Sequence, residues 1–237
     1  MNAAGGKVLG VLGGMGPLAS AQFMLRLTLL TPAARDQDHI PAVLWSDPRV
    51  PDRNAARLGT GPDPLPWLVG GLRGLEAAGC GAVAIPCNTA HGWIDGMRAA
   101  TRLPILHIID AAADDLRRQG VGPALVGVMG TAATLAMRLY QDQLGTAGWP
   151  TIEPSPEEMA ALVTPAIEQV KANRVAEAYA PLAEMVGRLR DRGAKAVVLG
   201  CTEIPLAIQA GPWQTLGVPV VDTIDALARA AIAWARS

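Results

Sequence analysis

Short apolar runs of strand length recur along the chain, and helical patterns of mixed polarity lie between most of them. Strands that alternate with helices are typical of parallel sheets built from right-handed βαβ units and buried on both faces. The pattern therefore predicts an α/β fold. The expected strands are 8–12, 42–45, 82–85, 105–108, 124–128, 196–199 and 218–221, with a weaker candidate near 151.

Helix boundary signals fit the same alternation. Pro17 is placed to open the first helix, and Ser155-Pro156-Glu157-Glu158 combines a cap, a first-turn proline and a capping-box glutamate. Gly120 and Gly193 stand where helix ends are expected. A final helix is predicted over 223–236, and we expect it to pack against the first half of the chain.

The second half of the chain repeats the first in three ordered segments. Each cysteine of the matched pair Cys87 and Cys201 follows its glycine by eight residues, and the two lie 114 residues apart (201 − 87). The matched segments are Val8–Gly13 with Leu125–Gly130, Gly79–Cys87 with Gly193–Cys201, and Leu103–Asp110 with Val218–Asp225. The repeat predicts two pseudo-symmetric three-layer α/β/α domains, each with about four parallel strands. Their expected extents are 1–109 with 222–237, and 110–221.

Composition excludes several classes of function. Half of the residues are apolar and 17% are charged, as in a globular protein, and the net charge of −1 supplies no basic field for nucleic acid. No apolar run reaches the roughly 20 residues that span a bilayer, and the first residues do not read as a secretory signal. We therefore expect a cytoplasmic protein. Three cysteines without a CxxC pair predict free thiols, with neither a disulfide framework nor a metal site.

The position of the paired cysteines favours chemistry over packing. A lone cysteine at the end of a buried strand is more often a small hydrophobic residue, and Cys80, which has Ala194 as its counterpart, is assigned to packing. Cys87 and Cys201 both follow the third strand of their half, at the edge where open α/β sheets bind ligands. The prediction is that both thiols face one interdomain cleft that holds a small substrate.

Inversion of an α-carbon needs a base on one face and an acid on the other, which two opposed thiols can supply. A helix N-terminus or a nearby cation lowers a thiol pKa from about 8.5 towards neutrality, so one cysteine can rest as thiolate and the other as thiol. We expect unpaired backbone N–H groups at both junctions. Together with Asn88, Thr89 and Thr202, they would hold the substrate α-carboxylate.

These residues resemble a known family. The segments GVLGGMGPLAS (10–20), PDR (51–53), PCNTAH (86–91), LPILHIID (103–110) and LGCTEIPL (199–206) look like the aspartate/glutamate racemases, and the resemblance spans the chain. It implies a racemase without PLP or another cofactor, usually a homodimer, in which the two cysteines transfer the proton of an amino-acid substrate. Aspartate is the expected substrate, with glutamate next.

The resemblance also implies roles for further residues. Arg53 and Lys171 would reach a side-chain carboxylate, although each could instead be solvated or pair with a helix C-terminus. Glu203 could polarise Thr202 or reach the substrate amine, and His91 could tune a thiol or cap backbone. Asn54 stands where family members typically have threonine. The remaining predicted substrate-binding residues are Met15 and Thr131.

Other functions fit parts of the pattern. Gly14–Ala19 matches the dinucleotide signature G-x-G-x-x-A, but no acidic residue directly closes the second strand, because Ser46 precedes Asp47. Maleate isomerases and hydantoin racemases share the paired cysteines, whereas Cys87 disfavours a single-cysteine decarboxylase of the arylmalonate type. A binding protein that retains the cleft would use the same carboxylate contacts. No apolar stripe in the sequence marks an interface on its own.

Overall fold

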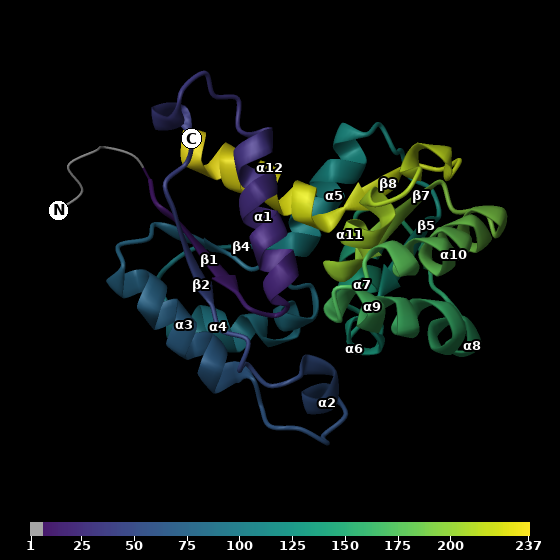
Figure 1. The fold of residues 1–237 in the computed structure, drawn as a ribbon, viewed down its shortest axis with the longest axis horizontal. Helices are drawn as coiled ribbons and strands as arrows, with labels where there is room; N and C mark the ends of the chain where they lie inside the picture. The colour runs from purple at the N-terminus through teal and green to yellow at the C-terminus, as the bar shows by residue number, and fades with distance from the viewer. Residues whose placement is uncertain (1–6) are drawn as a thin grey trace. The chain divides into compact units, whose positions relative to one another are not determined.

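The computed structural model describes residues 7–237. By its internal contacts the chain forms two compact units. The first holds the chain up to Ala111 together with Ile224–Ser237, and the second is Ala112–Thr223. Figure 1 shows strands and helices in both units. No helix of the described residues is long and apolar enough to cross a membrane.

The first unit contains a parallel four-stranded sheet in the order β2-β1-β3-β4. Every residue of the inner strands β1 and β3 is buried, whereas the edge strands are partly exposed. This burial is what continuous apolar runs predict for the centre of a sheet with helices on both faces. The strands are β1 (Leu9–Gly13), β2 (Ala42–Ser46), β3 (Ala82–Ala84) and β4 (Ile105–Leu106).

Helices cover this first sheet, and the last helix of the chain belongs to them. The Arg26 guanidinium forms a bidentate ion pair with Asp225 and so joins α1 to α12, which lie side by side in Figure 1. Helix α5 runs from the first unit into the second. The helices are α1 (Pro17–Leu30), α2 (Arg53–Arg57), α3 (Leu65–Ala77), α4 (Ile94–Ala100), α5 (Ile108–Arg118) and α12 (Thr223–Arg236).

The second unit repeats the arrangement in a parallel sheet of order β6-β5-β7-β8. Its strands are β5 (Val126–Gly130), β6 (Thr151–Ile152), β7 (Ala196–Gly200) and β8 (Val220–Asp222). Its helices are α6 (Ala132–Ala136), α7 (Leu139–Thr146), α8 (Pro156–Glu158), α9 (Thr164–Lys171), α10 (Tyr179–Asp191) and α11 (Glu203–Gln209). A π-turn over Met159–Val163 joins α8 to α9.

Strand register confirms the internal repeat residue by residue. Val11 pairs with Ala84 in the first sheet, and Val128 pairs with Val198 in the second. These are equivalent positions, because Cys87 and Cys201 each lie three residues beyond the paired residue of their own segment. The α/β class and the two four-stranded parallel sheets are therefore as predicted, including the weak strand near 151.

Local signals were also read correctly. Pro17 is the first residue of α1, and Ser155 with Glu158 forms a reciprocal capping box. Gly120 and Gly193 have positive φ angles of 72° and 101°, which a residue without a Cβ adopts at little cost. Gly14, with φ 93°, is constrained further, since a Cβ there would overlap the backbone of Asp47.

Helix α1 is apolar on two faces. Phe23 and Leu27 are buried against the first sheet, whereas Leu18, Leu25 and Leu29 are 38%, 51% and 62% exposed. These three leucines, spaced by seven and four residues, lie along one side of the helix. The structure thus contains an exposed apolar stripe that the sequence pattern did not reveal, because α1 has apolar residues on its exposed side as well as on its buried side, and such a pattern does not tell the two sides apart.

Candidate active site

Cys87 lies just past the C-terminal end of β3, after Ile85 and Pro86. Its side chain is buried, and its backbone N–H donates to Ile85 O at 2.8 Å. The expectation from the sequence, that the backbone N–H of Cys87 is unpaired at the start of a helix, is therefore wrong. Instead the chain makes a tight turn through Cys87, and a 3₁₀ turn, Thr89–Trp93, precedes α4.

His91 ties this turn to the start of helix α5. Its Nδ1 lies 2.9 Å from Cys87 O, and Ile108 N donates to its Nε2 at 3.3 Å. Since Nε2 accepts, Nδ1 carries the proton and donates to the Cys87 carbonyl. Burial, helped by the neighbouring charge of His107, lowers the pKa of His91 to about 3, so the ring is neutral. The sequence allowed His91 either to tune a thiol or to cap the backbone, and its two hydrogen bonds support the second role.

Acid should weaken the first unit through His91. The pKa of His91 is about 3 in the folded protein and about 6.5 when unfolded, so the unfolded state binds more protons between these values. The contribution of the neutral His91 to the free energy of unfolding is complete above pH 6.5 and falls as the pH drops below that value. We expect a loss of about 2 kcal/mol between pH 6.5 and 5. Burial also lowers the pKa of His107, which adds in the same direction.

Urea unfolding from pH 8 to pH 5 would measure this effect. His91→Gln should cost about 1 kcal/mol at pH 8, because one hydrogen bond is lost, and should unfold with a flatter dependence on pH than the wild type. His39→Gln is the matched control, since His39 lies in the loop before β2. Parallel wild-type and His91→Gln curves would contradict a buried neutral imidazole.

Cys201 directly follows β7 and is also buried. Its Sγ–H donates to Glu203 Oε2 at 3.0 Å, and Thr202 Oγ1 donates to the same oxygen at 3.4 Å. Glu203 therefore polarises both the thiol and the Thr202 hydroxyl. A carboxylate this close to sulfur favours the protonated thiol, because it would repel a thiolate.

Tyr140 of α7, which sequence reasoning missed, packs on the backbone at Gly200, the residue before Cys201. Its side chain is fully buried, and a Cβ placed on Gly200 would lie 3.0 Å from its ring. Burial and the charge of Cys201 both raise the pKa of Tyr140 far above its usual value. No spacing in the sequence links Tyr140 to Cys201. Its only signal is that it is one of two tyrosines in the chain.

Arg53 is the first residue of α2, not part of an irregular loop, and Asp52 caps this helix by accepting from Ala55 N. Its Nη1 donates to the carbonyl oxygens of Val50 and Pro51, at 3.3 and 3.0 Å. Its buried Nε has no hydrogen-bond partner among the described residues. One edge of the guanidinium, Nε with Nη2, is thus not engaged by the described residues.

Lys171 ends α9, and its Nζ donates to Glu168 Oε1 at 2.8 Å. Burial is the largest single influence on the pKa of Lys171 and acts to lower it. The hydrogen bond and charge of Glu168, together with the charges of Cys201 and Glu203, outweigh burial in sum, and the pKa is raised. The ammonium group is therefore held as a cation within the electrostatic reach of Cys201. The sequence alone left two roles open for Lys171: it could bind a substrate carboxylate, or it could be solvated or paired with a helix C-terminus.

The remaining predicted residues follow strand ends within their own units. Met15, two residues past β1, is 2% exposed, and Thr131, directly past β5, caps α6 by accepting from Thr134 N. Asn88 and Thr89 are buried beside Cys87, as is Thr202 beside Cys201. Parallel strands bring these residues to the C-terminal edge of each sheet, where such folds bind ligands.

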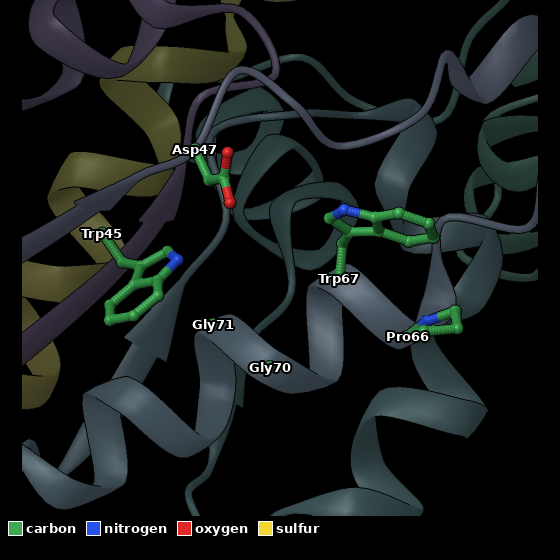
Figure 2. Close-up of a pocket in the computed structure, with 6 residues that line it drawn as sticks. All are labelled: Trp45, Asp47, Pro66, Trp67, Gly70 and Gly71. Carbon is green, nitrogen blue, oxygen red and sulfur yellow. The ribbon is translucent and has the colours of Figure 1, made fainter.

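The first unit has a hollow that is lined by aromatic side chains and lies beside β2 and α3. Figure 2 shows Trp45 of β2 and Trp67 of α3 on either side of Gly70 and Gly71, with Asp47 above them, around a volume of about 350 Å³. Asp47 is already held by the Arg49 guanidinium, and this hydrogen bond lowers the pKa of its carboxyl. Both indoles are about two-fifths exposed, so the hollow belongs to the apolar surface of this unit.

Two solved structures are similar to this chain over nearly its whole length. The Picrophilus torridus aspartate racemase is 32% identical, with a TM-score of 0.86 over 98% of this chain and 95% of that one. The glutamate racemase of Francisella tularensis, solved with D-glutamate, is 16% identical, with a TM-score of 0.70 over 97% and 81% of the two chains. At 16% identity, the similarity to the glutamate racemase shows a shared fold.

Sequence comparison agrees with the structural neighbours. The broad specificity amino-acid racemase RacX of Bacillus subtilis is 23% identical over 236 residues, which cover 95% of this chain and 96% of that protein. Residues 12–231 match the family model described as Asp/Glu/Hydantoin racemase. With the two sheets and the paired cysteine segments in register, the match extends over both units, and the chain belongs to the Asp/Glu/hydantoin racemase family.

Proposed function

We propose that the protein is a PLP-independent racemase that interconverts L- and D-aspartate with Cys87 and Cys201 as its proton-transfer pair. The observation that carries this proposal is the equivalent placement of the two buried thiols, three residues beyond register-matched strand positions in the two sheets. The 32% identity to the Picrophilus torridus aspartate racemase supports the choice of substrate.

In this mechanism Cys87 and Cys201 act on opposite faces of the substrate Cα. One cysteine, as thiolate, takes the Cα proton and becomes a thiol. The other, as thiol, gives its proton to the opposite face of the carbanion and becomes a thiolate. Protons balance, the configuration is inverted, and the reverse reaction exchanges the two roles.

The contact between Cys201 and Glu203 supports a choice of starting protonation states for the two cysteines. Because Cys201 donates its proton to a buried carboxylate at 3.0 Å, Cys201 begins as the acid and Cys87 as the base. Lys171 balances the charge once Cys201 has lost its proton, since its ammonium interacts with both Cys201 and Glu203.

Both substrate carboxylates have candidate ligands. Asn88, Thr89 and Thr202 would hold the α-carboxylate, since their polar side chains lie directly beside the thiols. The open Nε–Nη2 edge of Arg53 matches the geometry of a side-chain carboxylate, which guanidinium groups bind with two parallel hydrogen bonds. Lys171 would add positive charge, and Met15 and Thr131 would complete the walls of the site.

Exchange of the Cα proton is the direct test. In deuterium oxide without PLP, aspartate of either hand should gain deuterium at Cα and racemise, followed by NMR and chiral chromatography. Activity towards many amino acids without preference for aspartate would replace the aspartate assignment with the broad specificity of RacX. If the protein isomerises maleate and does not exchange the Cα proton of any amino acid, it is a maleate isomerase of the same superfamily and not an amino-acid racemase.

We further propose that a homodimer forms through the exposed side of α1. Leu18, Leu25 and Leu29 make this side uncharged, so two copies can pack α1 against α1 about a two-fold axis without burying charge.

Leu25→Glu should convert the dimer to a monomer, because it buries a carboxylate at the centre of the contact, and analytical ultracentrifugation would measure the mass. The matched control is Trp213→Glu, which places the same charge on an exposed apolar residue of the second unit. A Leu25→Glu protein that remains dimeric would exclude this face.

The three cysteines are free thiols, which suits a reducing compartment, and on this ground we propose a cytoplasmic location.

A further inference from the structure

Glu203 is a buried acid without a cation beside it. Among the described residues, the buried carboxyl side chains are those of Asp115 and Glu203, with exposures of 5% and 6%. Asp115 forms an ion pair with the Arg118 guanidinium at 2.7 Å. No described cation forms an ion pair with Glu203, because Lys171, whose charge acts on it, donates instead to Glu168. Since a buried charge is costly unless it is paired, this carboxylate is suited to a cationic ligand.

The two oxygens of the Glu203 carboxylate differ in their contacts. Oε2 accepts from the Cys201 thiol at 3.0 Å and from the Thr202 hydroxyl at 3.4 Å. Oε1 accepts no hydrogen bond from the described residues, and it is open to solvent although the side chain as a whole is buried. The open oxygen therefore belongs to a carboxylate that already touches the sulfur of Cys201.

The position of Oε1 fits one group of an amino-acid substrate. In the proposed reaction Cys201 exchanges a proton with Cα, and the α-ammonium nitrogen is bonded directly to Cα. A substrate whose Cα lies at the Cys201 sulfur therefore brings its ammonium group within reach of the Glu203 carboxylate. This group supplies both a positive charge and N–H donors, which together make a charge-assisted hydrogen bond.

We propose that Glu203 selects α-amino acids by accepting a hydrogen bond from the substrate α-ammonium group at Oε1. This inference rests on the proposed racemase function. The carboxylate keeps the substrate nitrogen protonated, and the positive charge of that nitrogen stabilises the carbanion that forms on the neighbouring carbon. No proton leaves the ammonium group, so the proton balance of the reaction is unchanged.

Three ligands with the same carbon backbone and the same two carboxylates provide the test. Aspartate carries an α-ammonium group, malate carries a hydroxyl group of similar size, and succinate carries hydrogen at this position. Isothermal titration calorimetry with racemic aspartate and racemic malate avoids any change of ligand during the measurement. The wild type should bind aspartate at least about tenfold more tightly than malate or succinate. Equal affinity for all three ligands would overturn the proposal, and this comparison needs no variant.

Glu203→Gln removes the charge but keeps the shape of the side chain and an oxygen that can accept from Cys201. The Kd of aspartate should rise by about 10- to 100-fold, as expected for the loss of one charge-assisted hydrogen bond, whereas the Kd of succinate should not rise. Glu184→Gln is the matched control, because it makes the same substitution at an exposed residue of α10 in the same unit. Equal weakening of aspartate and succinate in folded Glu203→Gln would reject ammonium recognition.

The outcomes separate the ammonium site from the racemase assignment. Binding of aspartate that depends on Glu203, without exchange of its Cα proton, would keep the ammonium site and remove the racemase assignment. Racemisation of aspartate with an unchanged ratio of aspartate to succinate affinity in Glu203→Gln would do the reverse. If proton exchange identifies another amino acid as the substrate, that amino acid and its analogue without the amine replace aspartate and succinate, and the same ratio decides.

Discussion

Replacing either Cys87 or Cys201 with alanine should reduce racemisation of aspartate by about a thousandfold or more. In the proposed mechanism each thiol is the base for one enantiomer and the acid for the other, and general acid–base catalysis by one positioned group contributes about 10²- to 10⁴-fold. Because inversion needs both groups, the loss should affect both directions in both variants. Chiral chromatography of the products measures it.

Proton exchange should then separate the two faces of the substrate. A variant that retains one cysteine can still remove the proton of the enantiomer that faces this thiol and return a deuteron to the same face. Cys87→Ala and Cys201→Ala should therefore retain slow exchange in opposite enantiomers, without inversion. Exchange of the same enantiomer in both variants would contradict a two-base mechanism.

Cys80→Ala is the matched control for this experiment. Cys80 is buried in the core of the first unit, where its side chain packs beside Gly10, and burial raises the pKa of its thiol. This variant should keep its racemisation rate, at most with a small loss of stability. A large loss of activity in folded Cys80→Ala would show that thiol replacement harms the enzyme by a route other than proton transfer.

The second large effect is expected at Arg53. Arg53→Gln should lower kcat/KM for aspartate by at least about 100-fold, because two charge-assisted hydrogen bonds to the side-chain carboxylate would be lost, and each contributes about 1.5 to 3 kcal/mol in such settings. Any activity towards alanine, which has no side-chain carboxylate, should change little. Steady-state kinetics with both substrates measure the difference.

Arg57→Gln provides the control on the same helix, since Arg57 is the last residue of α2 and is exposed. This variant should resemble the wild type with either substrate. If Arg53→Gln instead slows both substrates equally, the contacts of Arg53 with Val50 and Pro51 would account for its role, and it would hold the loop rather than the ligand.

Much of the fold could be read from the sequence because its signals are local. The strand runs, the Pro17 helix start and the Ser155 capping box depend on residues that are close together in the chain, and all three occur as predicted. The repeat added long-range information, since equivalent residues of two similar halves occupy equivalent strand positions. In this way sequence alone placed Cys87 and Cys201 at matching sheet edges.

The details of the site depend on contacts that no local pattern encodes. Tyr140 and Gly200 are 60 residues apart (200 − 140), and only the packing of α7 against the end of β7 brings them together. From the sequence His91 could have tuned a thiol. In the fold, Ile108 at the start of α5 lies beside the ring, and its backbone N–H donates to Nε2 of His91. The exposed side of α1 was hidden because both sides of this helix are apolar.

The sequence by itself determined the α/β class, the order of strands and helices, the duplication and the cysteine pair, because periodicity, capping and repetition act through near neighbours or copied positions. Only the tertiary structure decided how each charged or polar group is used. The carboxylate of Glu203 accepts from Cys201, one edge of the Arg53 guanidinium donates to the backbone while the other is open, and the ring of Tyr140 packs on Gly200. These are directional contacts between distant segments, and their geometry exists only after the sheets have assembled and packed.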